Sequence, residues 1–247
     1  MQHNLLTISL KTPKFIFGVF LFACICFHQV AYSDDYSDLN ISVINEINNY
    51  KYSRPTVKSS SQAQSLVESI HFKIFESVKE LCAFEDINEK ECIWTISIIR
   101  SPEFNAYASR GKRITLTSGL IDSLSDDDEL AFIIAHEIGH HLYDHIDQNM
   151  KTSFISMVLG TIILDSTELG FIAGNIINAA TSIRKELSAD AIAYRIIHRA
   201  GFDTSKARQA LFRIAKRDQR INSEFLQTHP SGMERIIAYD ELERLSE

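Results

Sequence analysis

The segment His136-Glu137-Ile138-Gly139-His140, within the apolar run Leu130–Tyr143, is the stretch that decides the fold of this chain. Side chains four residues apart lie one above the other on a helix, so both histidines can offer a ring nitrogen to one divalent metal ion. Glu137, one step round the helix, can then face a metal-bound water. The same motif also arises by chance on ordinary core helices, so its surroundings decide between the two interpretations.

The residues before the motif indicate where its helix begins. Ser125 is followed by the acidic run Asp126–Glu129, which provides an N-cap and the negative charge that a helix N-terminus favours. From there to Tyr143 the pattern is apolar on nearly every side, as is typical of a buried central helix. Imidazole and carboxylate groups are costly in such a helix unless they are paired or bind metal, which favours a metal site.

A third ligand is expected downstream, because a catalytic zinc usually takes three protein ligands and keeps a fourth position for water. The best candidate is Glu186, in the helical stretch Ile183–Tyr194 that Gly201 is expected to close. Asp190 lies one turn further on the same face and could hold the other ring nitrogen of a ligating histidine. In isolation such a carboxylate pair is typical of a solvated helix face.

Several segments together resemble a known family. They are Asn105-Ala106-Tyr107-Ala108, Leu116–Ile121, His136–His140, Glu186–Asp190, and Thr228-His229-Pro230 followed by Arg235. Their order and spacing resemble the HtpX-like and CAAX-prenyl-protease group of zinc metallopeptidases, called family forty-eight, and in particular its soluble periplasmic members. The resemblance covers roughly residues 66–240, and Tyr107 stands where the family usually has Phe.

The resemblance implies one zinc ion per chain, bound by His136, His140 and Glu186, with Glu137 as the catalytic base. It also implies that Asp190 is a nearby catalytic acid, sometimes given a proton-donor role. The expected fold is α+β: a mainly helical, gluzincin-like metallopeptidase domain with a small antiparallel β-sheet beside the active-site helix.

These residues suit peptide hydrolysis. Zinc lowers the pKa of its bound water to about 7 and shares the charge of the oxyanion, while Glu137 takes the proton as the water attacks. The resemblance places His229 in the cleft near the metal, where three interpretations stay open. It is a catalytic donor to the oxyanion, a loop histidine ahead of a proline, or a side chain that occupies the fourth position on zinc and displaces the water.

Three strand-like segments predict the sheet. Ile93–Ile99 alternates apolar and polar residues, Asn105–Ser109 follows, and Arg110–Arg113 is typical of a turn into Ile114–Thr117. An extended peptide could add to the edge of such a sheet as a further strand, although a purely structural hairpin is the alternative. The residues expected at the substrate-binding edge are Asn105, Ala106 and Tyr107.

The N-terminus is typical of an exported protein. Lys11 and Lys14 precede the apolar run Phe15–Phe27, and small residues follow at Ala31–Ser33. The apolar run is too short to span a bilayer comfortably. We therefore expect a signal peptide over 1–33 and a periplasmic location.

The rest of the chain is expected to form a polar N-terminal arm over 34–65, with a short helix conceivable at 40–50, and a metallopeptidase domain over 66–247. The less favoured alternative for the N-terminus is a lipoprotein anchored through Cys24, because the preceding residues resemble a lipobox. The interrupted apolar stretch 154–180 predicts two short helices, over the cleft or in the core.

Export would leave Cys82 and Cys92 as an even pair. In an oxidising compartment the two thiols could form a disulfide that closes a short loop ahead of the first strand. Neither thiol is expected to bind the metal, and the zinc argument is the same if they stay reduced.

The function expected from these features is a zinc-dependent endopeptidase of the periplasm or cell envelope. As the resemblance implies, its substrates would be unfolded or misassembled envelope proteins, with a membrane surface or outer-membrane assembly machinery as a further partner. The alternative is a periplasmic assembly factor or chaperone with little or no proteolysis. A net charge of −7 argues against nucleic acid as a partner.

Overall fold

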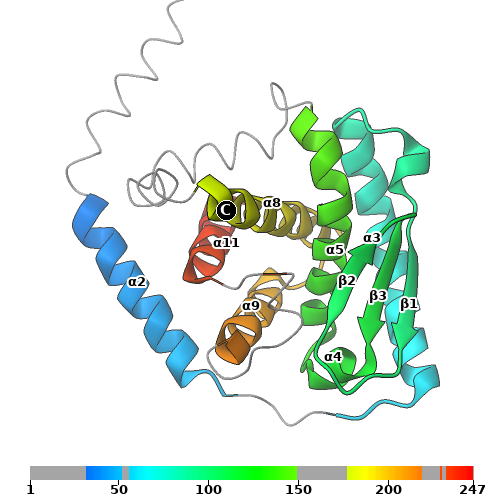
Figure 1. Cartoon of the computed structure of the whole chain (residues 1–247), viewed down its shortest axis with the longest axis horizontal. Coiled ribbons are helices and arrows are strands. Elements are labelled where there is room, and N and C mark those ends of the chain that lie inside the picture. Colours follow the sequence, from blue (N-terminus) through cyan, green and yellow to red (C-terminus); the bar gives the residue numbers. More distant parts are fainter. Residues whose placement is uncertain (1–31, 52–55, 149–176, 219–228, 230–231, 247) are drawn as a thin grey trace, which may run out of the picture. The chain divides into compact units, whose positions relative to one another are not determined.

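The computed structural model describes residues 32–51, 56–148, 177–218, 229 and 232–246 (Figure 1). The chain divides into two units, Met1–Ser42 and Val43–Glu247, and the fold below is that of the second. The elements in chain order are α2 (Tyr32–Asn49), α3 (Ser60–Phe84), η1 (Glu89–Cys92), β1 (Thr95–Ile99), β2 (Ala106–Ser109), β3 (Arg113–Thr117), α4 (Ser118–Ser123), α5 (Asp127–Gln148), α8 (Ile177–Arg199), α9 (Thr204–Asp218) and α11 (Met233–Ser246).

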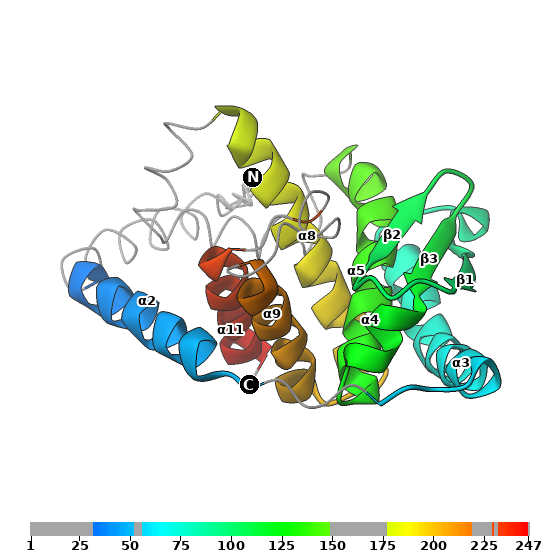
Figure 2. The same ribbon diagram turned by 60° about the horizontal axis from the view of Figure 1, so that its bottom comes forward.

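Helix α5 is the central element, as the sequence predicts. It packs against α8, α9 and α3 and against strands β2 and β3 (Figures 1 and 2). The predicted N-cap is wrong by one residue, because Oδ1 of Asp126, not the side chain of Ser125, accepts from the Asp128 amide at 3.2 Å. The Ser125 amide instead donates to Glu129 Oε1 at 3.1 Å. These bonds satisfy amide groups that have no partner inside the helix.

Helices α5 and α8 cross at very close range, and Gly139 makes this approach feasible. A Cβ atom at Gly139 would lie 2.8 Å from the backbone oxygen of Ala189 and 2.9 Å from its Cα. No side chain fits between the two backbones at this crossing. The close approach therefore places the two motif histidines of α5 directly opposite the middle of α8, which carries Glu186.

The sheet is mixed, which corrects the predicted antiparallel sheet. Its order is β1-β3-β2, with β2 antiparallel to β3 and β1 parallel to β3, so that Thr95 pairs with Arg113. The chain reverses after β1 and again after β2, so β3 runs in the direction of β1. Strand β3 is the central strand, and four of its five residues are buried. The edge strand β1 alternates between exposed and half-buried positions.

Helix α2 covers the first part of the stretch 34–65 predicted as a polar arm, and it includes nearly all of the segment 40–50 for which the sequence allows a short helix. Within the second unit, Val43 of α2 is buried. The Lys216 ammonium of α9 donates to the carbonyl oxygens of Asn48, at 2.9 Å, and Tyr50. A cation at these carbonyls satisfies acceptors that the end of a helix leaves without partners.

Helix α3 begins at Ser60, ahead of the expected domain start at residue 66. A capping box fixes this start: the Ser59 hydroxyl accepts from the Gln62 amide at 3.3 Å, and the Gln62 side chain accepts from the Ser59 amide at 2.9 Å. Near the other end of α3, Cys82 forms a disulfide with Cys92 of η1.

None of the described helices is both long and apolar enough to cross a lipid bilayer. The predicted signal peptide at 1–33 lies almost wholly outside the described residues. Of the stretch 154–180, only residues 177–180 are described, and they form the start of α8.

Candidate metal centre

Four donor side chains from distant parts of the sequence converge on one point. His136 and His140 come from α5, Glu186 from α8, and His229 from the segment ahead of α11. The Nε2 atoms of the two motif histidines are 3.0 Å apart. Glu186 Oε2 lies 3.4 Å from His136 Nε2, and Glu186 Oε1 lies 3.4 Å from His140 Nε2.

His229 completes this arrangement from the opposite side. Its Nδ1 lies 3.4 Å from His136 Nε2, 3.2 Å from His140 Nε2 and 3.4 Å from Glu186 Oε2. The ring is buried, and its Nε2 lies 3.4 Å from Glu137 Oε1. The structure therefore brings His229 to the donor cluster, as both the catalytic and the blocking interpretation of this residue require.

The spacing of the donors fits a tetrahedral metal ion. Zinc binds nitrogen and oxygen at about 2.0–2.1 Å, so two ligands of a tetrahedral zinc lie about 3.3 Å apart. The closest approaches within the cluster, 3.0–3.4 Å, match this value. Three nitrogens and a carboxylate oxygen also form a donor set that suits zinc.

The buried carboxylate of Glu137 is a second indication, beside the donor spacing, that the site binds a metal ion and a water molecule. Its side chain is completely buried, and among the described residues neither carboxylate oxygen accepts a hydrogen bond. Burying a carboxylate in this state is costly. A water molecule held beside a metal ion would satisfy these oxygens.

A second layer of charged groups holds the ligands from behind. Asp190 Oδ1 lies 2.8 Å from His136 Nδ1, which leaves Nε2 of that ring facing the donor cluster. Arg235 donates from Nε and Nη2 to Asp190 at 2.7 Å each, and its Nη1 lies 3.1 Å from Glu186 Oε2. Both oxygens of Asp190 are thus engaged behind His136. This geometry is that of the outer partner expected from the sequence, and it directs the carboxylate away from the cleft.

The electrostatics of the cluster favour a cation at its centre. Burial acts to lower the pKa of His136, but Asp190 and Glu186 outweigh it and raise that pKa to about 9. Burial, together with the nearby positive His136, lowers the pKa of His140 to about 2. Burial acts to raise the pKa of Glu186, but bonds from His136 and His229 lower it overall. Without metal, a proton on His136 supplies the positive charge that the carboxylates require.

The three residues predicted at the substrate edge differ in accessibility. Asn105 and Ala106 are buried, and the backbone of Asn105 exchanges hydrogen bonds of 3.0 Å with Thr117. Tyr107, on the edge strand β2, has 36 % of its surface exposed. Of the three, Tyr107 therefore offers the side chain that an added peptide strand could contact.

Two sets of contacts around the site were not predicted from the sequence. Arg235 was noted only as part of the resemblance, and its bidentate bond to Asp190 depends on a long-range contact between α8 and α11. Trp94 Nε1 donates to His141 Nδ1 at 2.8 Å, and His141 Nε2 donates to Ser109 O at 3.0 Å. The position of His141 directly after a ligand candidate, in a chain with one tryptophan, was the available signal.

Together, a His-Glu-X-X-His helix, a carboxylate from a second helix and a small mixed sheet define a gluzincin-like metallopeptidase fold. Residues 71–243 match Peptidase family M48, and the chain belongs to this family.

Curated relatives agree with this family. The chain is 25 % identical to the mitochondrial metalloendopeptidase OMA1 of Saccharomyces cerevisiae over 69 % of this chain and 53 % of that protein. It is 25 % identical to the metalloprotease LoiP of Escherichia coli over 56 % of this chain and 58 % of that protein. It is 30 % identical to a putative beta-barrel assembly-enhancing protease of Vibrio cholerae over 60 % of this chain and 34 % of that protein. The matches thus span between a third and three fifths of these relatives.

Proposed function

We propose that this protein is a zinc-dependent endopeptidase. The observation that carries the proposal is the cluster of His136, His140 and Glu186 beside the buried carboxylate of Glu137, which lacks a hydrogen-bond partner among the described residues. A metal site with a purely structural role has no use for a buried base at its side, whereas hydrolysis of a peptide bond requires one.

The roles of the residues follow from their positions. When bound, zinc supplies a Lewis acid that acidifies water and polarises the peptide carbonyl. Glu137 accepts the proton of the attacking water and delivers it to the nitrogen of the leaving amine, so that the carboxylate is regenerated. Asp190 fixes the tautomer of His136, and Arg235 fixes Asp190.

His229 is assigned a blocking role in the arrangement seen here. Its Nδ1 lies among the three expected ligand atoms, at the place where the fourth position would open. With a metal ion bound at this point, the ring would have to move away before water could take the fourth position. The competing assignment, a donor to the oxyanion, requires the ring to remain near the metal after such a movement.

We also propose that the protein acts in the cell envelope on unfolded or misassembled proteins. Lys11, Lys14 and the apolar run that follows support export, and the Cys82–Cys92 disulfide suits an oxidising compartment. The name of the V. cholerae relative, a putative beta-barrel assembly-enhancing protease, supports a link to beta-barrel assembly.

The direct test is the cleavage of unfolded casein by the purified chain with zinc, with a chelator, and in a Glu137→Gln variant. We expect cleavage only by the zinc-loaded wild-type protein. Glu76→Gln on the exposed surface of α3 removes the same charge and should cleave casein normally. Suppression of casein aggregation without cleavage, equal in wild type and Glu137→Gln, would instead support the chaperone alternative.

A further inference from the structure

A cavity of about 640 Å³ opens directly beside the candidate metal centre. Its walls are the short helix η1, the turn between β2 and β3, and two residues of α5, His140 and His141. Because His140 is one of the expected ligands, a group bound in this cavity would lie next to the reacting peptide bond. The final residues of β2, Ala108 and Ser109, also line it, so a peptide added along β2 would pass its mouth.

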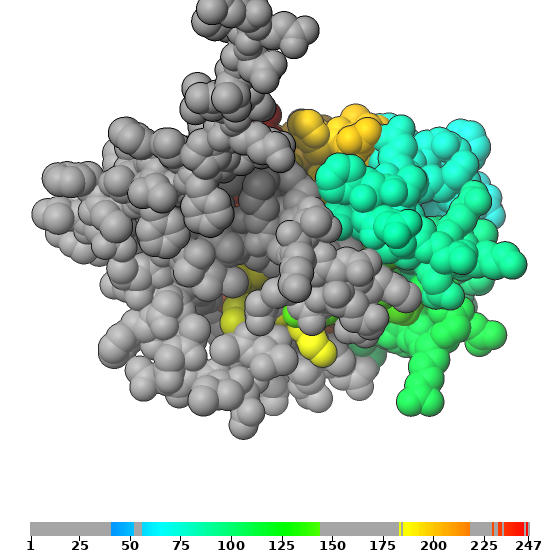
Figure 3. All heavy atoms as spheres, turned by 90° about the horizontal axis from the view of Figure 1, so that it is seen from above, coloured from blue at the N-terminus to red at the C-terminus, as the bar shows by residue number. Residues whose placement is uncertain are grey.

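The charge of the cavity is opposite to that of the whole chain. Three cations, Lys90, Arg110 and Lys112, line it together with one carboxylate, Glu91. The chain as a whole carries a net charge of −7. In the space-filling view, teal residues that precede β1 adjoin green residues of the β2–β3 region on one face (Figure 3). A positive pocket on an acidic protein attracts anionic groups selectively.

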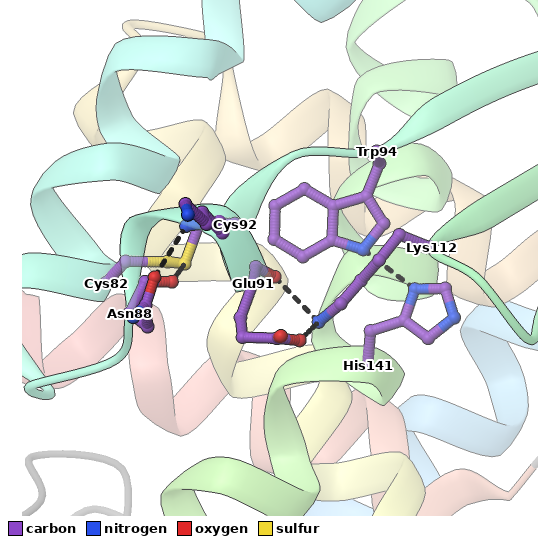
Figure 4. The surroundings of a disulfide bond; sticks show 8 residues. Cys82, Asn88, Glu91, Cys92, Trp94, Lys112 and His141 are labelled. Atoms are coloured by element: carbon purple, nitrogen blue, oxygen red, sulfur yellow. Dashed lines mark hydrogen bonds and ion pairs between the residues drawn. A yellow bond between two sulfur atoms is a disulfide. The ribbon is translucent and has the colours of Figure 1, made fainter.

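Lys112 is held in place as a fixed part of the wall. Its ammonium lies 2.7 Å from the carbonyl oxygen of Glu91 and 2.8 Å from the Glu91 carboxylate (Figure 4). Its φ of 58° lies in the left-handed region, which is sterically unfavourable for a residue with a side chain. The Thr95 amide, at 2.9 Å from the Lys112 carbonyl oxygen, helps to maintain this conformation.

The remaining walls are also fixed by specific contacts. The disulfide joins Cys92, the last residue of η1, to Cys82 of α3. On the opposite side, the Trp94 indole contacts His141 (Figure 4). The other ring nitrogen of His141 lies 3.0 Å from the carbonyl oxygen of Ser109. The cavity is therefore bounded by groups whose positions are set before a ligand arrives, which lowers the entropic cost of binding.

Arg110 differs from the other two cations in its position. It lies exposed in the turn between β2 and β3, next to Gly111, whose φ of 79° suits the turn. A guanidinium at this position can bind a carboxylate through two parallel hydrogen bonds. An ammonium group does not offer this bidentate geometry.

We propose that this cavity is a substrate subsite that binds an acidic side chain of the peptide near the scissile bond, with Arg110 as the residue that determines specificity. This inference rests on the proposed endopeptidase function and adds a substrate preference to it. The Lys112–Glu91 pair forms the fixed wall, and Arg110 supplies the paired donors.

The test uses peptides that differ only in a Glu or Gln, moved one residue at a time through the positions around the cleaved bond. At one position we expect kcat/KM to be at least about tenfold higher for Glu, because a charge-assisted hydrogen bond contributes at least this factor and the Gln side chain lacks the charge. In Arg110→Ala the Glu-to-Gln ratio should fall to near one, and in Arg110→Glu a Lys peptide should replace Glu as the preferred substrate. Arg100→Ala, at the end of the sheet away from the turn, removes the same charge and should retain the ratio.

A binding measurement separates this inference from the proposed function. In the zinc-loaded Glu137→Gln protein, fluorescence anisotropy should show tighter binding of the Glu peptide than of its Gln partner, and Arg110→Ala should remove the difference. Casein cleavage together with equal kcat/KM for Glu and Gln at every position would overturn the subsite alone. Absence of casein cleavage with a retained, Arg110-dependent preference in binding would overturn only the endopeptidase function.

Discussion

Asp190 is the residue that holds a metal-ligand candidate, His136, from behind. The carboxylate of Asp190 is buried completely between His136 and Arg235. Burial alone would raise the pKa of Asp190, but Arg235 and His136 lower it, so this carboxylate stays ionised. An ionised Asp190 is the stronger acceptor for the His136 ring and makes that ring a better ligand.

We therefore expect Asp190→Asn to lower zinc affinity about 10–100-fold, because the amide holds the His136 ring less firmly. Competition with a chromogenic chelator measures this affinity. Asp240→Asn, which removes a carboxylate that pairs with Arg208 away from the centre, serves as the control and should leave zinc affinity unchanged. An Asp190→Asn protein with wild-type zinc affinity would contradict the positioning role.

Substitution of His229 distinguishes a ring that blocks the fourth metal position from a ring that stabilises the oxyanion. If the ring blocks the fourth position, as its distances of 3.2–3.4 Å from the other donors indicate, His229→Ala should raise the initial rate of casein cleavage. If the ring is needed for the oxyanion, the same variant should lose about 100–1,000-fold in kcat. Zinc content, measured in parallel, shows whether a lost activity reflects lost metal.

At the scale of elements, the crossing of α5 and α8 matters most for the site. The motif histidines and Glu186 belong to different helices, and their spacing depends on how closely the two backbones approach. Gly139 sets this distance, because a Cβ atom there would overlap the backbone of Ala189. The glycine in the motif thus has a packing role that the spacing of the histidines does not reveal.

Gly139→Ala should push the two helices apart. We expect an unfolding free energy lower by about 1–3 kcal/mol, as for other overpacked cores, together with weaker zinc binding. Gly201→Ala is the matched control, because its φ of 73° makes alanine strained while no atom lies within 4 Å of the added Cβ. It should lose stability and retain zinc affinity. Unchanged zinc affinity in Gly139→Ala would mean that the crossing distance does not set the site.

At the scale of the whole molecule, metal binding should stabilise the folded state. The ligands are separated by up to 93 residues in sequence, from His136 to His229, and they come together only in the folded chain. An ion that binds only the native state stabilises it by about 2.7 kcal/mol at a concentration 100 times its Kd.

Removal of zinc by a chelator should therefore lower Tm, and zinc added back should restore it. In a Glu186→Ala variant the effect of the chelator on Tm should become much smaller, because a ligand is missing. The control is Glu103→Ala, at an exposed loop position. An equal fall in Tm for wild type and Glu186→Ala would indicate that the chelator acts elsewhere.

Local patterns in the sequence predicted much of this molecule. The apolar run and its acidic start predicted α5, and the spacing of the two motif histidines predicted that they share a site. Glu186 was a candidate from the next helical stretch, and only the resemblance placed His229 near the metal. The parallel pairing of β1 with β3 was not predicted, because these strands pair out of chain order and local patterns do not reveal such pairing. Helix α2 was expected only in part, since its apolar residues are few and its end is held by Lys216 of a distant helix. The link from Arg235 to Asp190 likewise arises only from tertiary contact.

The bond between Cys82 and Cys92 connects α3 to the short helix beside the cavity, and neither cysteine touches the donor cluster. The same polypeptide prepared under reducing and under oxidising conditions would then hold equal amounts of zinc yet rank acidic peptides differently. Preparations with the same zinc content would therefore differ in substrate specificity according to whether Cys82 and Cys92 are oxidised or reduced.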